Sequence, residues 1–326
     1  HTAFLARISA TRVIVMSKNL VIVESPAKAQ TIKKYLGTDF EVLASYGHVR
    51  DLVPKEGAVD PDHDFAMKYQ VIDKNEHHVE AIAKAIVKAD ALFLATDPDR
   101  EGEAIAWHLY EILRQRDLLK DKLVQRVVFH EVTQRAIQDA IAHPRSLSLD
   151  LVNAQQARRA LDYLVGFNLS PLLWRKIRPG LSAGRVQSPA LRMIVERELE
   201  IEAFRSQEYW TVHLDSHKDH QPFSAKLFQY QGKKLEQLSI GSQAEYDAIF
   251  AKLNDAKLPP KVVRVEKKAK QRYAAAPFTT STLQQEAVRK LGMTADRTMR
   301  TAQSLYEGVD IGGQTVGLIS YMRTDS

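Results

Sequence analysis

The sequence predicts an α/β fold built on a parallel sheet, followed by helical and strand-rich segments. Short apolar runs of buried-strand type alternate with amphipathic helical stretches in the first part of the chain, and this alternation predicts the parallel sheet. Beyond residue 149 the pattern turns helical and then becomes short alternating strands, which predicts separate later segments. A chain of 326 residues has room for about two or three domains.

The first strand is expected at Asn19–Glu24, a largely β-branched run. Ser25 can cap the helix that follows, Pro26 suits its first position, and Gly37 would end it. The strand therefore ends in a carboxylate, that of Glu24, immediately before a helix.

The second strand is expected at Ala91–Thr96, and a helix is expected at Glu101–Leu113, where apolar side chains recur at helical spacing. A third strand and helix are expected at 125–132 and 133–143. Three strands, each followed by a helix, are typical of a parallel sheet with crossover helices.

The later segments are expected to be helical from Leu149 to Ala203 and to form short strands from Tyr209 to about Ile240. Residues 257–273 are predicted to be a basic connector, and two helices follow that end at Gly292 and Gly308.

Helix caps and one loop are predicted near the end of the chain. Ser281 or Thr282 can cap the first of the last two helices, and Thr294 can cap the second. The polar, glycine-rich stretch at 307–317 predicts a flexible loop. A strand-like run then carries Tyr321 and Arg323 on one face.

Composition limits the classes of function. The net charge of +6 and the pI near 9.2 permit a nucleic-acid partner without requiring one. The chain has no cysteine, so it has no disulfide and no Cys-built zinc site. No apolar run approaches the roughly 20 residues of a membrane span. No phosphate-binding loop, G-x-S-x-G elbow or H-E-x-x-H zinc helix occurs, so nothing points to ATP hydrolysis or to these hydrolases.

Four carboxylates, those of Asp97, Asp99, Glu101 and Glu103, follow directly after the second apolar run. Functional groups collect at the carboxyl ends of parallel strands, so Glu24 would converge with Asp97 and Asp99 if their strands are neighbours. Repulsion makes such convergence costly unless a cation compensates it, and oxygen donors alone suit Mg²⁺. The alternative is a solvated acidic loop at a helix N-terminus.

Other stretches are suited to phosphate. The turn at Gly180–Leu191 leads into a helix whose first amides, with Arg185, could bind an anion, although ordinary helix capping looks the same. Arg158 and Asp162 can pair on an amphipathic helix, as a solvated ion pair or as a basic face toward DNA. The hydroxyl of Tyr321 is a weak nucleophile that needs activation.

Together these segments resemble the type IA DNA topoisomerases, the bacterial topoisomerase I group most closely. The matching stretches, in family order, are LVIVESPAKAQTI, GHVRDL, ATDPDREGEAIAWHL, NAQQARRALDYLVGFNLSPLLW with GLSAGRVQSPALRMIVERE, and PFTTSTLQQEA with SYMRTDS. They cover most of Leu20–Ser326, and the match is weak around 209–273.

The resemblance implies an ATP-independent isomerase that relaxes negatively supercoiled DNA. It would cut one strand, pass the other through and reseal the first, with Tyr321 linked to the 5′ phosphate. Mg²⁺ would be the cofactor, and Glu24 would also serve in proton transfer to the leaving 3′ oxygen. The implied metal ligands are Glu24, Asp97, Asp99 and Glu101, and the implied contacts of the scissile phosphate are Lys28 and Arg323.

The resemblance also implies a DNA-contact set and a single-stranded DNA partner. The enzyme is expected to act as a monomer at the cytoplasmic nucleoid, with no membrane or nucleotide cofactor. The expected DNA contacts are His48, Arg158, Arg159, Asp162, Arg175, Ser182, Ala183, Gly184, Arg185, Val186, Gln187, Gln284 and Arg323.

By the same resemblance, the chain is the incomplete first part of a toroidal multidomain core and is not expected to relax DNA by itself. The expected segments are a Toprim α/β metal-binding domain at 18–145, the first part of a helical DNA-binding domain at 146–204, the first part of a β-rich arch domain at 205–273, and the start of the tyrosine domain at 274–326. Residues 1–17 are expected to be an upstream extension because of their own composition, with the start of the protein at Met16.

Other interpretations stay open. A Toprim-type nuclease or primase would share Glu24, Asp97 and Asp99 but would lack the role of Tyr321. A truncated, non-catalytic DNA-binding remnant is a third possibility. Within the family topoisomerase III is the nearest rival, and the wording VIVESPAKA and DREGEAIAWH favours topoisomerase I.

Overall fold

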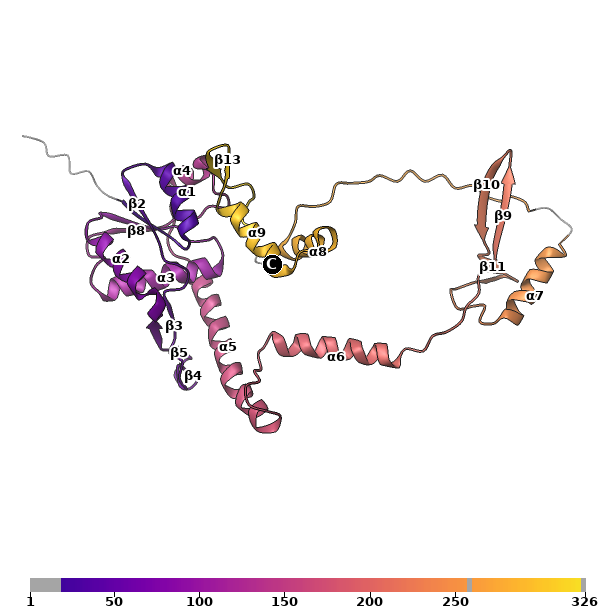
Figure 1. Ribbon diagram of the computed structural model, residues 1–326, viewed down its shortest axis with the longest axis horizontal. Coiled ribbons are helices and arrows are strands. Elements are labelled where there is room, and N and C mark those ends of the chain that lie inside the picture. Colours follow the sequence, from indigo (N-terminus) through magenta and orange to yellow (C-terminus); the bar gives the residue numbers. More distant parts are fainter. Residues whose placement is uncertain (1–18, 257–259, 324–326) are drawn as a thin grey trace, which may run out of the picture. The chain divides into compact units, whose positions relative to one another are not determined.

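The computed structural model describes residues 19–256 and 260–323, and this part of the chain divides into two compact units (Figure 1). The first unit comprises the described residues up to Arg185 together with those from Ala276 onward, and the second is 186–275. The domain boundaries expected after 145, 204 and 273 stay predictions. The extension expected at 1–17 lies outside the described residues.

A four-stranded parallel sheet forms the centre of the first unit. Its strands are β1 (Asn19–Val23), β2 (Phe40–Ala44), β7 (Ala91–Leu94) and β8 (Leu123–Arg126), in the order β2-β1-β7-β8. All three pairings are parallel. The predicted parallel sheet is therefore confirmed, and β1 and β7 are direct neighbours.

Both faces of this sheet are covered by helices, as a parallel sheet requires. Alternate side chains of the central strands enter two apolar cores. One core packs against α2 (Glu76–Val87) and α3 (Arg100–Gln115), and the other packs against α1 (Pro26–Leu36) and α4 (Gln134–Ala142) (Figure 1). No helix of the described residues is long and apolar enough to cross a membrane.

Side-chain caps fix the helix starts close to the strand ends. Ser25 accepts the Lys28 amide at the start of α1, and Gly37 ends that helix with a positive φ of 78°. Asp99 caps α3 by accepting the Gly102 amide at 2.8 Å. The helix after each central strand therefore begins beside the carboxyl end of the sheet, and the predicted cap and end of α1 are confirmed.

Two helices and a hairpin complete the first unit. The helices are α8 (Thr280–Leu291) and α9 (Ala295–Glu307). Thr294 and Gly308 bound α9 as expected, but Thr279 caps α8 instead of Ser281 or Thr282.

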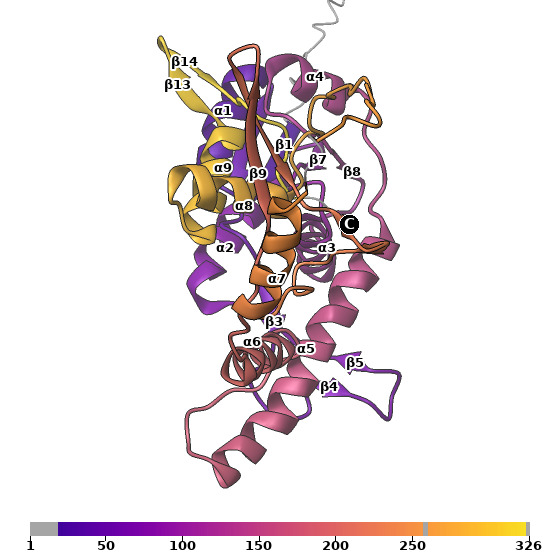
Figure 2. The same ribbon diagram turned by 90° about the vertical axis from the view of Figure 1, so that its right-hand side faces the viewer.

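The flexible loop expected at 307–317 is wrong. This stretch forms a hairpin of β13 (Val309–Ile311) and β14 (Gln314–Val316), joined by two glycines with positive φ. The hairpin lies beside α1 (Figure 2), where Lys34 Nζ and the Tyr35 hydroxyl both donate to Thr315 at 2.8 Å. These contacts to α1 order a short polar hairpin.

Helix α5 (Leu149–Lys176) packs along α3 and continues beyond it. Its Tyr163 is buried: the hydroxyl accepts the Ala58 amide at 3.2 Å and donates to the Lys55 carbonyl. These contacts fix α5 to short strand pairs inserted after β2. The inserted elements are β3 (Arg50–Leu52), β4 (Val59–Asp60), β5 (Ala66–Met67), β6 (Tyr69–Val71) and the 3₁₀ turn η1 (Asp73–Asn75).

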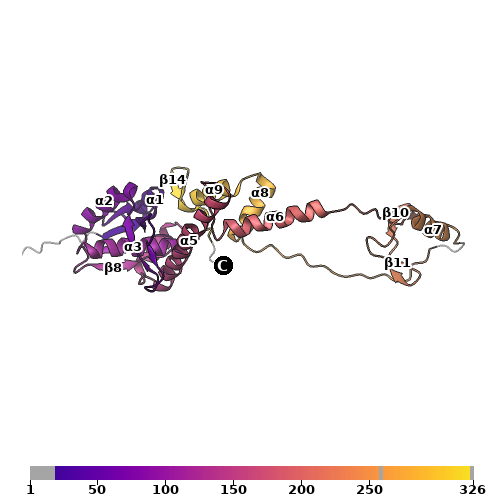
Figure 3. The same ribbon diagram turned by 90° about the horizontal axis from the view of Figure 1, so that it is seen from below.

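The second unit begins with α6 (Gln187–Ala203) and continues with short strands, as the sequence predicts, and with one helix that was not predicted. β10, β11 and α7 gather in one group (Figure 3), over a small apolar core. The remaining elements of this unit are β9 (His213–Lys218), β10 (Gln221–Lys226), β11 (Gln229–Tyr230), β12 (Lys233–Lys234) and α7 (Gln243–Asn254).

Candidate active site

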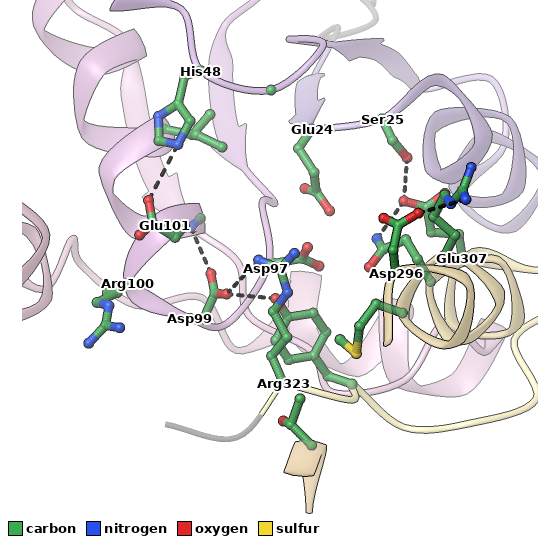
Figure 4. A pocket seen from close by; sticks show the side chains of 18 of the residues that line it. Glu24, Ser25, His48, Asp97, Asp99, Arg100, Glu101, Asp296, Glu307 and Arg323 are labelled. Carbon is green, nitrogen blue, oxygen red and sulfur yellow. Dashed lines mark hydrogen bonds and ion pairs between the residues drawn. The ribbon is translucent and has the colours of Figure 1, made fainter. Parts of the chain in front are cut away.

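The acidic residues that follow β1 and β7 converge at the carboxyl end of the sheet. Because these two strands pair directly, Glu24, Asp97 and Asp99 line one cavity of about 870 Å³. Tyr321 and Arg323 line the same cavity from the C-terminal segment (Figure 4). The predicted convergence of the acids is confirmed, and all five side chains belong to the first unit.

Lys28 joins two of these acids. Its ammonium lies 2.6 Å from Glu24 Oε1 and 2.7 Å from Asp97 Oδ1, and the side chain is fully buried. Burial by itself lowers the pKa of Lys28, but the adjacent charges of Glu24 and Asp97 outweigh it and hold that pKa above its usual value. Lys28 therefore stays charged and compensates part of the repulsion between the acids.

Glu24 lines the cavity at the end of β1, and its side chain is largely buried. Burial raises the pKa of this carboxyl to about 7, although the Lys28 charge opposes the shift. The second carboxylate oxygen, Oε2, is buried and has no hydrogen-bond partner among the described residues. A buried oxygen without a partner is unfavourable, so this atom is suited to a ligand.

Asp99 links helix α3 to Tyr321. One carboxylate oxygen caps the helix, and the other accepts the Tyr321 hydroxyl at 2.7 Å. Burial, followed by the charges of Asp97 and Asp99, raises the pKa of Tyr321. The hydroxyl is therefore protonated and held at Asp99, while Arg323 Nη1 lies 3.9 Å from the same carboxylate.

The strand expected around Tyr321 is wrong, because β14 ends at Val316 and the described residues that follow form no strand. The backbone is instead tied to the sheet region by single hydrogen bonds. Gly317 donates to the Val132 carbonyl at 3.1 Å, and Tyr321 donates to the His130 carbonyl at 2.7 Å. Tyr321 and Arg323 were predicted to lie on one face of a strand. Without the strand, both side chains still approach the same carboxylate, that of Asp99.

Glu101 is directed away from Lys28. Its Oε2 lies 3.3 Å from His48 Nε2 and accepts Gln155 Nε2 at 3.2 Å. The hydrogen bond from His48 is the main cause that lowers the pKa of Glu101. His48, Glu101 and Arg158 form the wall of the cavity nearest to α5.

Arg159 of α5 and Arg185, in the turn after that helix, each have an acidic partner. Arg159 binds both oxygens of Asp51 at 2.8 and 3.0 Å, and Arg185 Nε lies 2.6 Å from Asp162 Oδ1. Arg159 and Asp162 line a second cavity of about 590 Å³, which shares Arg158 with the first.

The other expected DNA contacts are more scattered. Arg175 lines a third cavity, and the Ala183 amide donates to Ser170 Oγ at 3.2 Å. Gln284 lies on α8 but does not line the first cavity. The turn that carries Ser182 and Gly184 ends the first unit, and Val186 and Gln187 begin the second.

Arg126 was missed by the sequence analysis. Its fully buried guanidinium donates to the carbonyls of Leu94, Thr96 and Asp97 and to Glu103 Oε2 at 2.9 Å. It therefore holds the loop that carries the metal-binding candidates. An arginine at the end of a buried strand is a signal that could have found it, because a buried charge requires partners.

Glu103 is the buried partner of arginine side chains. Its oxygens accept Arg126 and Arg145, and the Ser148 amide completes the set at 2.7 Å. Burial opposes its charged form, but these hydrogen bonds and charges hold the pKa of Glu103 below its usual value. The fourth acid of the cluster therefore has a structural partner set of its own.

Helix α9 was predicted as a helix, but its place in the remaining wall of the cavity was missed. Glu307 Oε1 accepts Ser25 Oγ at 2.8 Å, and Arg300 pairs with Asp296 at 2.6 Å (Figure 4). Met299 and Gln303 of the same helix also line the cavity.

The donor set of the cavity suits a hard cation. Carboxylate oxygens are the ligands that Mg²⁺ prefers, and Glu24 Oε2 is an oxygen that needs a partner. In the present arrangement Lys28 lies between Glu24 and Asp97. Within residues 19–256 and 260–323, no three His, Asp or Glu side chains are already spaced around a metal position.

Comparison with known proteins gives two sequence-family matches. Residues 146–326 match the family described as DNA topoisomerase, and residues 19–132 match the Toprim domain. The two matched ranges include both groups of site residues, the acids after the strands and the tyrosine segment.

Individual relatives are similar over nearly the whole chain. The chain is 63% identical over 313 residues to DNA topoisomerase 1 of Xylella fastidiosa (strain Temecula1 / ATCC 700964). The aligned stretch covers 95% of this chain and 38% of the relative. It is 56% identical over 308 residues to DNA topoisomerase 1 of Rickettsia felis (strain ATCC VR-1525 / URRWXCal2), with 94% and 39% covered. The chain thus spans about two-fifths of the length of the curated relatives it matches.

A solved structure gives the same result. Full-length topoisomerase I from Thermotoga maritima matches with a TM-score of 0.77 at 40% sequence identity. The match covers 94% of this chain and 49% of that one.

Proposed function

This chain belongs to the type IA DNA topoisomerase family, and from that premise we propose that it carries the strand-cutting site of an ATP-independent enzyme that relaxes negatively supercoiled DNA. The observation that supports this most directly is the hydrogen bond from the Tyr321 hydroxyl to Asp99, beside Glu24 and Asp97 in one cavity. A nucleophile, acids and a guanidinium within one cavity are the groups that phosphodiester exchange requires.

Cleavage begins at Tyr321. Its oxygen attacks the scissile phosphorus and forms a bond to the 5′ phosphate, while the bond from phosphorus to the 3′ oxygen breaks. Asp99 accepts the hydroxyl hydrogen bond and is the group in reach of its proton. We assign to Glu24, whose carboxyl lines the same cavity, the transfer of a proton to the leaving oxygen.

Rejoining is the same sequence in reverse. The 3′ hydroxyl attacks the phosphotyrosine, its proton returns to Glu24, and Tyr321 leaves as the phenol. One phosphodiester is exchanged for another, so the two sides of the reaction are close in energy. No nucleotide cofactor is therefore required.

Charge at the phosphate is stabilised by fixed cations. Arg323 lines the cavity next to Tyr321, and its planar guanidinium can bind two phosphate oxygens. Lys28 contributes a buried charge between Glu24 and Asp97. Mg²⁺ would be held by Glu24, Asp97 and Asp99, with Glu101 as the further acid of the motif, and would supply additional positive charge beside the phosphate.

The partner proposed for the first unit is single-stranded DNA, exposed by negative supercoiling. Arg158, Arg159 and Arg185 carry positive charge along one side of the cavities, and phosphates would compete with Asp51 and Asp162 for them. The remaining proposed contacts are His48, Arg175, Ser182, Ala183, Gly184, Val186, Gln187 and Gln284. We place the enzyme at the nucleoid as a monomer.

The test is the chemical identity of the protein–DNA product. The full-length protein is mixed with an end-labelled single-stranded oligonucleotide and Mg²⁺, then analysed on a denaturing gel. A covalent adduct with the 5′ phosphate on Tyr321 is expected. Cleavage that leaves no adduct would favour a Toprim nuclease, and binding without cleavage would favour a non-catalytic DNA-binding protein.

A further inference from the structure

Tyr306, in the last turn of α9, reaches the centre of the site although no strand end carries it. Its side chain is completely buried. Its ring meets the Tyr321 ring edge to face, with centroids 5.1 Å apart at 63°. The Lys28 ammonium lies 5.2 Å from the Tyr306 ring centroid. One side chain thus contacts both the tyrosine and the buried cation of the proposed reaction.

Lys28 is enclosed by two acids and two rings. Glu24 and Asp97 bind its ammonium, and the ring of Phe129 lies 4.8 Å away on another side. Cations are attracted to aromatic faces, most strongly where water is excluded. Of these neighbours only Tyr306 belongs to the segment 276–323, so the enclosure of Lys28 is complete only when that segment is docked.

The position of Tyr306 is fixed by the residue that follows it. Glu307 accepts Ser25 Oγ through its carboxylate, and its backbone carbonyl accepts Thr31 Oγ1 at 3.1 Å. Both partners belong to the cap and body of α1, the helix that carries Lys28. The last turn of α9 is therefore held directly against the helix whose lysine Tyr306 touches.

Both contacts described above are made by the Tyr306 ring. The hydroxyl oxygen is buried without a hydrogen-bond partner among the described residues. A phenylalanine would therefore keep both contacts of the ring, whereas an aliphatic side chain would lose the aromatic face.

We propose that Tyr306 is a positioning residue that holds the Lys28 ammonium and the Tyr321 ring in one arrangement, so that cation and nucleophile are placed together when the C-terminal segment docks. The role of Tyr306 in cleavage rests on the proposed function. Its effect on Lys28 does not, because the enclosure of the ammonium is a property of the fold.

The first experiment compares Tyr306→Leu and Tyr306→Phe in the full-length protein. The rate of adduct formation is measured in single turnovers at saturating oligonucleotide, and affinity is measured separately. Tyr306→Leu should slow adduct formation about 10-fold through loss of the desolvated cation–ring contact. Affinity should change less than about twofold, since a buried side chain touches no phosphate. Tyr306→Phe should stay within about threefold of the parent rate, because its ring remains.

Phe40→Leu is the matched control. Phe40 packs against the same apolar core but lies at the amino end of the sheet, away from the acids. Its loss should lower the melting temperature and leave the rate within about twofold, since the cavity lies at the opposite, carboxyl end of the sheet. The positioning role of the ring would be overturned if Phe40→Leu lost as much rate as Tyr306→Leu, or if Tyr306→Phe were as slow as Tyr306→Leu.

The second experiment does not depend on cleavage. In the ¹⁵N-labelled chain, the Lys28 ammonium protons should exchange slowly and give an NMR signal in the parent and in Tyr306→Phe. The signal should broaden or vanish in Tyr306→Leu. An unchanged signal in Tyr306→Leu overturns the proposal. Absence of any Tyr321 adduct in the parent overturns the proposed function and leaves this measurement to decide the role of Tyr306.

Discussion

Tyr321 and Asp99 are 222 positions apart in the sequence, and the tyrosine hydroxyl donates a 2.7 Å hydrogen bond to the aspartate. Asp99 lies at the start of α3, and Tyr321 lies in the segment that returns after the second unit. The docking of this segment thus assembles the proposed nucleophile with its proton acceptor.

Tyr321→Phe should abolish the covalent adduct and leave oligonucleotide affinity nearly unchanged. Only the proposed nucleophilic oxygen is removed, and the ring keeps its contact with Tyr306. The measurement is adduct yield on a denaturing gel beside an affinity titration. Tyr273→Phe, at an exposed tyrosine of the second unit, is the control. Adduct formed by the Tyr321→Phe protein would remove Tyr321 from the mechanism.

Asp97→Asn combined with Asp99→Asn should remove Mg²⁺ binding measured by calorimetry on this chain. Two of the three proposed ligands lose their charge, and a hard cation depends on it. The control is Asp117→Asn with Asp121→Asn, at the turn beyond α3. Equal Mg²⁺ affinity in both double variants would refute the assignment.

Gly102→Ala should destabilise the first unit by about 1–3 kcal/mol, because a Cβ at this position would overlap the Asp97 carbonyl. The free energy of unfolding in urea measures this. Gly166→Ala is the matched control: Gly166 is also helical, but nothing lies within 4 Å of its Cβ position. There alanine should stabilise by up to about 1 kcal/mol. The same sign of change at both positions would contradict the close approach.

His108 should make stability depend on pH. Burial, together with the charges of Arg50 and His48, lowers the pKa of His108 from 6.5 to about 3. In the unfolded chain His108 binds a proton below about pH 6.5, whereas in the folded chain it binds one only below about pH 3. The contribution of this group to the free energy of unfolding is therefore full above pH 6.5 and is lost as the pH falls from 6.5 to 3. The slope from this group approaches about 1.4 kcal/mol per pH unit within that window.

His108→Asn tests this contribution, because its side-chain oxygen can replace the ring nitrogen that accepts Arg50 Nε at 2.9 Å. The difference in unfolding free energy between parent and variant should shrink as pH falls from 7 to 4. His63→Asn, at an exposed histidine, is the control for removing an imidazole outside the core. A constant difference for His108→Asn would mean that the folded protein protonates this ring near its usual pKa.

Binding of single-stranded DNA should weaken steeply with salt, because phosphate contacts release counterions. Arg158→Ala should lower the slope of log affinity against log salt by about 0.7 if this side chain contacts one phosphate. Arg116→Ala is the control, since Arg116 pairs with Glu80 at the far end of α3. Fluorescence titrations at several salt concentrations give both slopes, and an identical loss for the two variants would argue against a specific phosphate contact.

The parallel sheet and most helix limits could be predicted because their signals are local. Ser25 and Gly37 bound α1 through the chemistry of their own side chain and backbone. The convergence of Glu24 with Asp97 also followed, because strand ends in a parallel sheet share one edge. Roles assigned through the resemblance, such as that of Arg323, stay predictions until tested.

Partner choice within the acidic cluster could not be predicted from the sequence. Glu103 pairs with Arg126 and Arg145, which are 23 and 42 positions away, while Glu101 pairs with His48 on one wall of the cavity. The spacing of these acids along the chain does not indicate which of them pairs with which basic residue. Only the packing of the fold determines the pairs. The hairpin at 307–317 was missed for a similar reason, since contacts with α1 order strands too short and polar to signal themselves.

The two carboxylate oxygens of Asp99 accept two different hydrogen bonds, one from the Gly102 amide of α3 and one from the Tyr321 hydroxyl. Asparagine could satisfy the amide but brings no negative charge to the phenol. Glutamate brings the charge, but its longer side chain is a poor cap. Serine and threonine can cap the helix with their single side-chain oxygen, but they have no second oxygen to accept the Tyr321 hydroxyl. Of these side chains, only that of aspartate both caps α3 and presents a negative charge to the Tyr321 hydroxyl.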